Sequence, residues 1–408
     1  MSDDPRPAGP AEVIVLGVGA AGWERMSEGD RATVLEADAV LGGARQLAML
    51  PEVPGQRREA WPSPLRAGLP ALLASLRGRV VALASGDPLV SGVGSTLLEL
   101  LPRELVVIRP AVSSVALARA RMGWPAESCA VVSVVGRDVA LVRRELAPRR
   151  RILVLSSDER TPREIAELLV ESGYGGSELS VLGDLGTGHA SRTTMPARLW
   201  SEADADVPRL NVVAIECAGP SLGGWAAGLP DEAYEHDGQL TKRDLRASAL
   251  ARLVPAPGEL LWDVGAGAGS VGIEWMRAHP ACAAIAVEAD PDRADRIARN
   301  ARRLGVPGLR VVNGRAPDAL TGLPAPDAIF VGGGATAGGV VATCLDALCP
   351  AGRLVVHGVT LETEQLLAGL HREHGGELTR ISVETAAPIG SFTGWTPARA
   401  VTQWAWTH

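Results

Sequence analysis

The chain has 408 residues, of which 46% are hydrophobic and 21% charged, and its formal net charge is -7. This length exceeds the usual limit of one hydrophobic core, so we expect two domains, and the negative charge argues against non-specific binding to nucleic acid. No apolar run approaches the roughly 20 residues that span a bilayer, and the acidic, proline-rich start MSDDPRPAGP is unlike a signal peptide, so we expect no membrane association and a cytoplasmic location.

The five cysteines form no CxxC pair, and none of them lies in a cluster of histidines. This spacing predicts neither a structural zinc site nor a disulfide framework, so we expect no metal. Most of the cysteines are then expected to be small buried hydrophobic residues.

The N-terminal half opens with a predicted strand over 13–16 that runs into the glycine-rich turn GVGAAG, which contains Gly17 and Gly19. A lone GxGxxG pattern is a weak signal for dinucleotide binding, because any connection from a strand to a helix can use glycines. A helix is expected over 30–40 and a buried strand over 79–84.

The second of these strands ends in the motif SGDPLVSGVGST. Asp87 is expected to form a turn there, while Gly92 and Gly94 permit a close approach of the backbone. Further on comes PAVSSVALARARMGWP, where Ser113 and Ser114 can cap a helix. Taken singly, each of these pieces is better explained as a turn followed by a helix cap.

Taken together and in this order, GVGAAG, SGDPLVSGVGST and PAVSSVALARARMGWP resemble the tetrapyrrole methylase family. Its members methylate porphyrinoid rings with S-adenosylmethionine in a cleft between two α/β subdomains, and the likeness covers roughly the first 215 residues. The resemblance implies that Gly17 and Gly19 border the substrate trough. It places near the cofactor Gly86, Asp87, Pro88, Gly92, Val93 and Gly94, with Ser113 and Ser114 on its other side.

A glycine-rich segment, CAGPSLGGWAAGL, follows the last apolar strand of this half, which is predicted over 210–215. Such a composition is typical of a domain boundary. We therefore predict a first domain over 1–219, a linker over 220–235 and a second domain over 236–408.

The second domain begins with a predicted helix over 241–253 that carries Lys242, the only lysine among the 40 basic residues of the chain. Genome base composition can produce such a bias toward arginine. A lysine ammonium is a compact charge that meets one carboxylate as a point contact. We therefore expect Lys242, Arg243 and Arg246 to hold substrate carboxylates, a solvated helix face being the alternative. His236, in the preceding loop, is the one histidine for which we expect a substrate role.

The stretch LLWDVGAGAGSVGIEW, over 260–275, predicts a strand, a nucleotide-binding loop and a helix. Gly265 would turn the chain off the strand, Gly267 would let the backbone approach a ligand, and Gly269 would allow close helix packing. A second strand ends in Glu288, at the distance from the loop where an acidic residue binds ribose hydroxyls. NAD enzymes and class I methyltransferases share this arrangement.

Three details favour a methyltransferase. Asp263 immediately precedes the loop, where it can act on the ammonium group of a methionine moiety. A long arginine-rich helix is expected over 291–304. The third strand, in VVNGRAPDAL, is followed by residues positioned to frame an adenine: Gly314, Arg315 and Ala316.

A fourth predicted strand, over 328–331, ends in Gly332, Gly333 and Gly334. Many class I methyltransferases carry an Asn/Asp-Pro-Pro-aromatic motif at this place, which holds an amino nitrogen for methylation. Its absence counts against methylation of nucleobase amines. The glycines leave an open floor suited to a broad planar substrate, or they form a tight turn before a helix over 340–348.

The motifs HDGQLTKRDLRA, WDVGAGAGSVGIEW, NGRAPDAL, IFVGGG and GSFTGWTPARAVTQW resemble the decarboxylating precorrin methyltransferase domain of cobalamin biosynthesis. The resemblance implies an α/β chain with a two-subdomain class III methyltransferase fold followed by a Rossmann-like class I fold, and one S-adenosylmethionine site in each. It implies a precorrin as the small-molecule partner, methylated at C5 by the first domain and at C15 by the second, which also removes carbon dioxide from the C12 acetate. It further implies a homo-oligomer.

Three other interpretations stay open. A class I methyltransferase acting on RNA or another small molecule, with an unrelated N-terminal domain, would need a basic surface and usually an amine-binding motif after the fourth strand, and both are missing. A NAD-linked oxidoreductase with two nucleotide folds and a non-catalytic tetrapyrrole carrier are the others.

Overall fold

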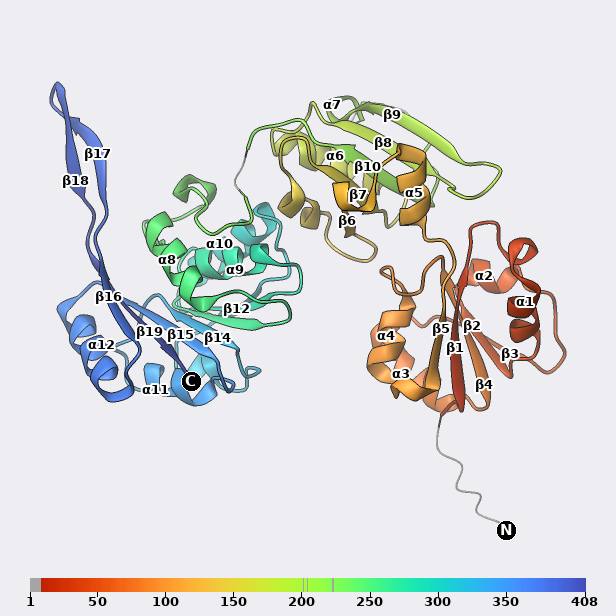
Figure 1. The fold of residues 1–408 in the computed structure, drawn as a ribbon, viewed down its shortest axis with the longest axis horizontal. Coiled ribbons are helices and arrows are strands. Elements are labelled where there is room, and N and C mark those ends of the chain that lie inside the picture. The colour runs from red at the N-terminus through yellow and green to blue at the C-terminus, as the bar shows by residue number, and fades with distance from the viewer. Residues whose placement is uncertain (1–8, 201, 204, 222–223) are drawn as a thin grey trace, which may run out of the picture. The chain divides into compact units, whose positions relative to one another are not determined.

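The computed structural model describes residues 9–200, 202–203, 205–221 and 224–408 (Figure 1). The chain divides into two compact units. The first comprises Met1–Arg137 and Arg149–Ala218, and the second comprises Asp138–Pro148 and Gly219–His408. Among the described helices, none combines the length and the apolar character of a membrane-spanning segment.

The first unit begins with five parallel strands, β1 (Glu12–Val18), β2 (Ala39–Gly42), β3 (Arg57–Ala60), β4 (Arg79–Ser85) and β5 (Val106–Arg109). Its helices are α1 (Glu28–Leu35), α2 (Ala44–Ala48), α3 (Leu65–Ser75) and α4 (Val93–Leu100). The strand order is β3-β2-β4-β1-β5. Along β1, Val13 and Val15 pack on the face of α3 and α4, while Ile14 and Leu16 pack on the face of α1. The continuous apolar run of β1 follows from this burial on both faces.

The predicted strands over 13–16 and 79–84 are confirmed as parts of β1 and β4. The predicted helix over 30–40 is wrong at its end, since α1 stops at Leu35. The chain then turns, and Ala39–Gly42 is buried as β2, where it pairs with β3 and β4.

A second five-stranded sheet completes the first unit, in the order β6-β7-β10-β8-β9. The strands are β6 (Cys129–Ser133), β7 (Arg151–Leu155), β8 (Glu178–Gly183), β9 (Ser191–Pro196) and β10 (Asn211–Glu216), with helices α5 (Ser114–Met122), α6 (Thr161–Glu171) and α7 (Ala197–Trp200). Strands β6 and β7 are parallel, whereas β10 is antiparallel to both β7 and β8. Val115 and Ala118 of α5 pack into the core of this sheet. The predicted pair of α/β subdomains is thereby confirmed.

The second unit is built on a seven-stranded sheet in the order β13-β12-β11-β14-β15-β19-β16. Its strands are β11 (Leu260–Val264), β12 (Ala283–Glu288), β13 (Arg310–Asn313), β14 (Ala328–Val331), β15 (Arg353–Gly358), β16 (Glu377–Ile381) and β19 (Val401–Thr407). The five strands β11 to β15 are parallel, and β19 is antiparallel to both of its neighbours, β15 and β16. Because β12 and β14 flank β11 on opposite sides, the crevice for a ligand is expected at the carboxyl ends of β11 and β14.

Helices cover both faces of this sheet. Residues of α8 (Arg243–Leu253), α9 (Ser270–Ala278) and α10 (Pro291–Arg303) enter one core, and residues of α11 (Val340–Ala347) and α12 (Leu361–His374) enter the other. The Rossmann-like class I fold is therefore confirmed. Helix α8 begins two residues later than the predicted 241–253, because Lys242 has an extended backbone and is the N-cap.

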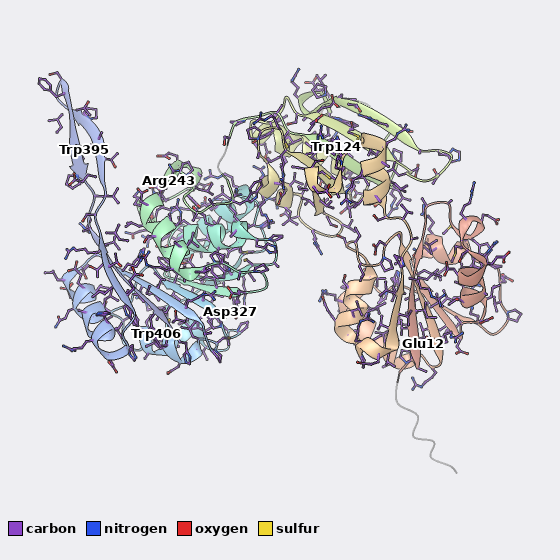
Figure 2. The ribbon with its side chains drawn as sticks, in the orientation of Figure 1. Glu12, Trp124, Arg243, Asp327, Trp395 and Trp406 are labelled. Carbon is purple, nitrogen blue, oxygen red and sulfur yellow. The ribbon has the colours of Figure 1, made fainter. Side chains whose placement is uncertain are left out.

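A hairpin of β17 (Glu384–Ile389) and β18 (Phe392–Pro397) forms a separate two-stranded sheet. Figure 1 shows this hairpin projecting beyond the seven-stranded sheet of its own unit, at the upper left. The side chains of Phe392 and Trp395, the latter labelled in Figure 2, are 79% and 70% exposed. An isolated hairpin buries little apolar surface, so this arm adds little to the core.

Candidate cofactor and substrate sites

The loop between β11 and α9 is shaped by Gly265, Gly267 and Gly269, whose φ angles are 66°, 59° and 75°. Glycine adopts this left-handed region without the strain that a side chain causes. A Cβ atom on Gly265 would lie 2.7 Å from the carbonyl oxygen of Gly333, and one on Gly269 would lie 2.7 Å from Cγ2 of Ile297 on α10. The loop therefore packs against the segment that follows β14, and close helix packing needs Gly269 as expected.

A cavity of about 260 Å³ lies at the carboxyl ends of β11, β12 and β14. It brings together residues that the sequence predicted from four separate motifs. The predicted site residues that line it are Gly265, Gly267, Glu288, Gly314, Arg315, Ala316, Gly332, Gly333 and Gly334. Other predicted residues of this unit lie outside its lining: His236, Lys242, Arg243, Arg246, Asp263 and Gly269.

Glu288 ends β12 with a buried side chain that faces the glycine loop. Its Oε2 accepts a hydrogen bond from the backbone N–H of Gly267 at 2.8 Å, and its Oε1 accepts one from Asp290 at 3.0 Å. A carboxylate has about four lone-pair positions, so each oxygen keeps the capacity to accept one more hydrogen bond. Glu288 can therefore receive hydroxyl groups of a ligand in the cavity.

The side chain of Asp263, in β11, is almost completely buried. Its Oδ2 accepts a hydrogen bond from the backbone N–H of Gly272 at 2.8 Å, while its Oδ1 has no hydrogen-bond partner among the described residues. Burial raises the pKa of Asp263 to about 7, and the hydrogen bond from Gly272 opposes this shift. A buried acceptor without a partner favours a donor or a cation beside it.

The predicted role of Arg246 in holding a substrate is wrong, because its side chain is fully buried. Its Nε donates to Oε1 of Glu274, Nη1 donates to Asp231, and Nη2 donates to the backbone oxygen of Leu229. The guanidinium also lies 4.9 Å from the ring centroid of Tyr234. A buried charge needs such pairing, and these contacts make Arg246 part of the core.

Lys242, Arg243 and His236 are exposed. Nζ of Lys242 lies 3.5 Å from Oδ2 of Asp231, and about half of its side chain is exposed. Arg243, labelled in Figure 2, starts α8, and Nδ1 of His236 accepts a hydrogen bond from the backbone of Gly238 at 3.1 Å. Their proposed contact with a substrate stays a prediction.

In the first unit, the ends of β1, β4 and β5 meet at one place. A Cβ atom on Gly17 would lie 2.1 Å from the carbonyl oxygen of Gly86 and 2.5 Å from the nitrogen of Ala111. The nitrogen of Ala111 also donates to that same oxygen of Gly86 at 3.3 Å. Gly17 and Gly86 thus form a side-chain-free junction at the carboxyl edge of the parallel sheet.

The remaining predicted residues of this unit surround the junction or pack beside it. Oγ of Ser113 accepts a hydrogen bond from Ala116 and caps α5, as the sequence predicted. Oδ1 of Asp87 accepts one from the backbone of Leu89 at 2.8 Å and forms the expected turn. Cβ atoms on Gly92 and Gly94 would lie within 2.8 Å of the carbonyl oxygen of Pro88, whereas one on Gly19 would meet open space. Ser114 is exposed, and Val93 packs against the core.

Two polar residues of the cavity at the carboxyl ends of β11, β12 and β14 were missed by the sequence analysis. Gln239 and Arg293 both line it. Gln239 stands in the motif HDGQL, three residues before Lys242, and Arg293 stands in the first turn of α10. The only available signal was that Gln239 stands in a motif of the predicted site and Arg293 stands in the helix after β12. Neither residue stands directly at the carboxyl end of a strand, where site residues are expected.

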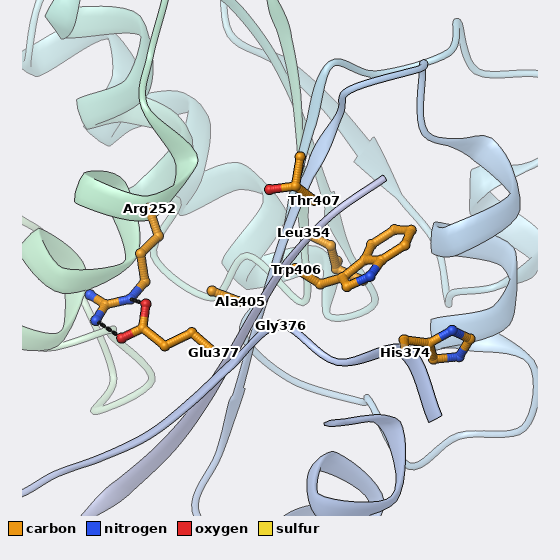
Figure 3. A pocket seen from close by; sticks show the side chains of 8 residues that line it. All are labelled: Arg252, Leu354, His374, Gly376, Glu377, Ala405, Trp406 and Thr407. Carbon is orange, nitrogen blue, oxygen red and sulfur yellow. Dashed lines mark hydrogen bonds and ion pairs between the residues drawn. The ribbon is translucent and has the colours of Figure 1, made fainter. Parts of the chain in front are cut away.

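A larger cavity of about 450 Å³ in the second unit is lined by none of the predicted residues (Figure 3). It contains Arg252, whose Nε lies 2.9 Å from a carboxylate oxygen of Glu377. Among the described residues, no group of three or more His, Cys, Asp or Glu side chains is placed to hold a metal ion.

Two family models match separate parts of the chain. A family model for tetrapyrrole (corrin/porphyrin) methylases matches residues 12–197, and one for a precorrin methyltransferase domain matches residues 232–408. A precorrin-6Y C(5,15)-methyltransferase (decarboxylating) from Sinorhizobium sp is 46% identical over 399 residues, which are 97% of this chain and 96% of the relative.

Two relatives from Salmonella typhimurium are shorter. A cobalt-precorrin-7 C(5)-methyltransferase is 35% identical over 176 residues, which are 42% of this chain and 84% of the relative. A cobalt-precorrin-6B C(15)-methyltransferase (decarboxylating) is 31% identical over 160 residues, which are 37% of this chain and 80% of the relative.

Proposed function

The chain belongs to the family of precorrin-6Y C5,15-methyltransferases (decarboxylating), and we propose that its two units divide the reactions of this family between them. As a member of this family, it is an S-adenosylmethionine-dependent methyltransferase of cobalamin biosynthesis. In our proposal the first unit methylates C5 of the precorrin, and the second methylates C15 and decarboxylates the C12 acetate. Two separate Salmonella relatives, each matching less than half of the chain and named for one of the two methylations, support this division.

The cavity at the carboxyl edge of the second sheet is the observation that carries the proposal for the second unit. We infer that S-adenosylmethionine is held there with its ribose hydroxyls on Glu288 and its adenine beside residues 314–316. The free lone pairs of Glu288 fit this ligand. Asp263 lies outside the lining, but its buried carboxylate, with one unpartnered oxygen, would favour a positive charge such as that of the methionine ammonium nearby.

Bound S-adenosylmethionine supplies an electrophilic methyl group, so the chain has mainly to orient the reacting carbon and to exclude water. Residues 332–334 supply a floor without side chains, which suits a planar macrocycle. Lys242 and Arg243 are the proposed partners of its carboxylates, without Arg246. When carbon dioxide leaves the C12 acetate, the electron pair of the broken bond passes into the conjugated ring, so the chain needs no electron sink of its own.

For the first unit we propose a second S-adenosylmethionine site at the junction of Gly17 and Gly86. The capped start of α5 at Ser113, beside the carboxyl ends of β1, β4 and β5, supports this placement. Gly17 and Gly19 would then border the macrocycle, as the family resemblance implies.

Mass spectrometry of the product made by two full-length variants tests this division. Glu288→Ala is expected to lose the C15 methylation, because it removes the proposed partner of the ribose hydroxyls. Gly86→Val is expected to give a decarboxylated product that lacks only the C5 methyl group, because its side chain would meet the backbone at Ser113, 2.9 Å from the Cβ position. A Glu288→Ala enzyme that still methylates C15, or a Gly86→Val enzyme that still completes both methylations, contradicts the proposal.

A further inference from the structure

The segment Glu235–Leu240, here called the strap, runs against the glycine loop of the second unit. Gln239 of the strap lines the cavity, and its carbonyl oxygen lies only 2.8 Å from the place that a Cβ atom on Gly267 would occupy. The contact is therefore between two backbones. Through Gln239 the strap contributes to the lining of the cavity.

Asn300 on α10 joins the strap to the glycine loop. Its side chain is fully buried. Its Oδ1 accepts a hydrogen bond from the backbone N–H of Glu235 at 2.8 Å, while its Nδ2 donates to the carbonyl oxygens of Glu235 and Ala268, each at 3.0 Å. One amide group thus fixes the distance between the strap and the glycine loop.

An ion pair holds the middle of the strap. Oδ2 of Asp237 lies 2.8 Å from Nε of Arg293 and 3.1 Å from Nη1 of Arg296, both on α10. The hydrogen bond from Arg293 holds the pKa of Asp237 well below its usual range, with further bonds from Gln239 and Arg296. Asp237 therefore stays ionised at every pH near neutrality, and the strap stays fastened to α10.

The side chain of Gln239 is the polar group of the strap that is free to bind a ligand. Its amide has no hydrogen-bond partner among the described residues, although the residue lines the cavity. Such an amide offers two N–H donors and a carbonyl acceptor. It can thus meet a polar ligand in the cavity.

We propose that the strap is part of the cofactor site, in which Gln239 contacts S-adenosylmethionine directly and Asn300 is a positioning residue that holds Gln239 against the glycine loop. This inference rests on the proposed function, since it takes S-adenosylmethionine to be the ligand of this cavity. The strap continues into Lys242 and α8, so the same fixed segment connects the cofactor site to the side chain proposed to hold the macrocycle.

Calorimetric titration of the full chain with S-adenosylhomocysteine tests the inference. Glu288→Ala first identifies the site of the second unit, since this variant is expected to lose one of the two binding events. Gln239→Ala and Asn300→Asp are each expected to weaken that same event by about tenfold. Asn300→Asp retains an acceptor for Glu235 but has no donor for the carbonyl oxygen of Ala268.

The matched control is Arg299→Ala. Nε of Arg299 pairs with the side chain of Glu235 at 3.0 Å on the exposed side of the strap, so its removal is expected to leave binding unchanged. Gln239 is exposed, and Gln239→Ala is expected to raise the KM for S-adenosylmethionine with an unchanged melting temperature, which a purely structural role would not produce.

The two proposals fail in different ways. If Glu288→Ala loses one binding event while Gln239→Ala and Asn300→Asp bind as the unchanged chain does, the strap inference is overturned and the cofactor site stands. If Glu288→Ala keeps both events, the proposed cofactor site is itself wrong. Should Asn300→Asp not fold, the result for Gln239→Ala alone decides.

Discussion

Nε of Arg246 and Oε1 of Glu274 form a completely buried ion pair at 2.5 Å. The same carboxylate accepts hydrogen bonds from the backbone of Gly228 and Leu229 and from the hydroxyl of Tyr234, at 2.6, 3.0 and 2.9 Å. Helix α9, which begins at the end of the glycine loop, is thereby tied to α8 and to the chain that precedes it.

Removing one member of this pair is expected to leave a buried charge without compensation. Arg246→Met should lower the free energy of unfolding of the second unit by about 3–5 kcal/mol. Urea unfolding followed by circular dichroism measures the loss. Arg243→Met, at an exposed position of the same helix, should change stability by less than about 0.5 kcal/mol. Equal effects of the two substitutions would show that the buried pair of Arg246 and Glu274 does not stabilise the second unit.

Asp263 is expected to make stability depend on pH in a specific direction. Its pKa is raised from 3.8 to about 7 in the folded chain, so the folded state binds more protons than the unfolded state between these values. The free energy of unfolding should therefore fall as pH rises through this window and level off above it. The measured quantity is the difference in the free energy of unfolding between the unchanged chain and Asp263→Asn, whose side chain cannot ionise. A difference that is constant from pH 4 to pH 8 contradicts the assignment.

Gly265→Ala tests the close approach of the loop to the glycines after β14. The new Cβ atom would lie 2.7 Å from the carbonyl oxygen of Gly333, at a φ of 66°. We expect binding of S-adenosylhomocysteine by the second unit to weaken by about tenfold or more, with C5 methylation retained. Gly369→Ala is the control, because a Cβ atom there meets nothing within 4 Å. Unchanged binding by Gly265→Ala would place the cofactor elsewhere.

Lys242→Ala separates substrate binding from cofactor binding. The lysine is half exposed and its ion pair with Asp231 is 3.5 Å long, so its loss should cost less than about 1 kcal/mol of stability. Binding of S-adenosylhomocysteine should be unaffected, whereas the KM for the precorrin should rise or decarboxylation should slow. Lys242→Arg, which keeps the charge, is the matched variant. Wild-type rates of C15 methylation and decarboxylation in Lys242→Ala would refute a substrate role.

The predicted cut between the domains leads to a comparison of two fragments. Leu229 and Tyr234, which fall in the predicted linker over 220–235, are buried in the core of the second unit. A fragment of residues 219–408 should therefore be more stable than one of residues 236–408, which lacks three hydrogen bonds to Glu274, by on the order of 3 kcal/mol. Thermal unfolding compares them. Equal melting temperatures would mean that residues 219–235 add nothing to the stability of the fragment.

The sequence was sufficient to predict the fold and much of the cavity, because strand, glycine loop and helix follow one another in a fixed order. Parallel strands bring their carboxyl ends to one edge, so Gly265, Glu288, Gly314 and Gly332 could be expected to meet. Gln239 was not identified, since it reaches the cavity through a strap without regular structure. The homo-oligomer and the cytoplasmic location stay predictions.

Arg246 was misassigned although a signal was present. Arg246, Ala249, Leu250 and Leu253 stand at positions i, i+3, i+4 and i+7 of α8, and all four are buried. A charged residue on the apolar stripe of a helix is more consistent with a buried ion pair than with a substrate contact. Its partner Glu274 could not be recognised, because it lies 28 residues further along the chain.

At Arg246 the arginine-rich composition of the chain has a consequence for which substitutions the position can accept. Where side chains are exposed, arginine and lysine can replace one another as base composition drifts, in either direction. At Arg246 the three nitrogens of the guanidinium group meet Glu274, Asp231 and the backbone oxygens of Leu229 and Thr241, a set that one compact ammonium group cannot span. This position is therefore expected to remain arginine even in a descendant whose genome regains lysine.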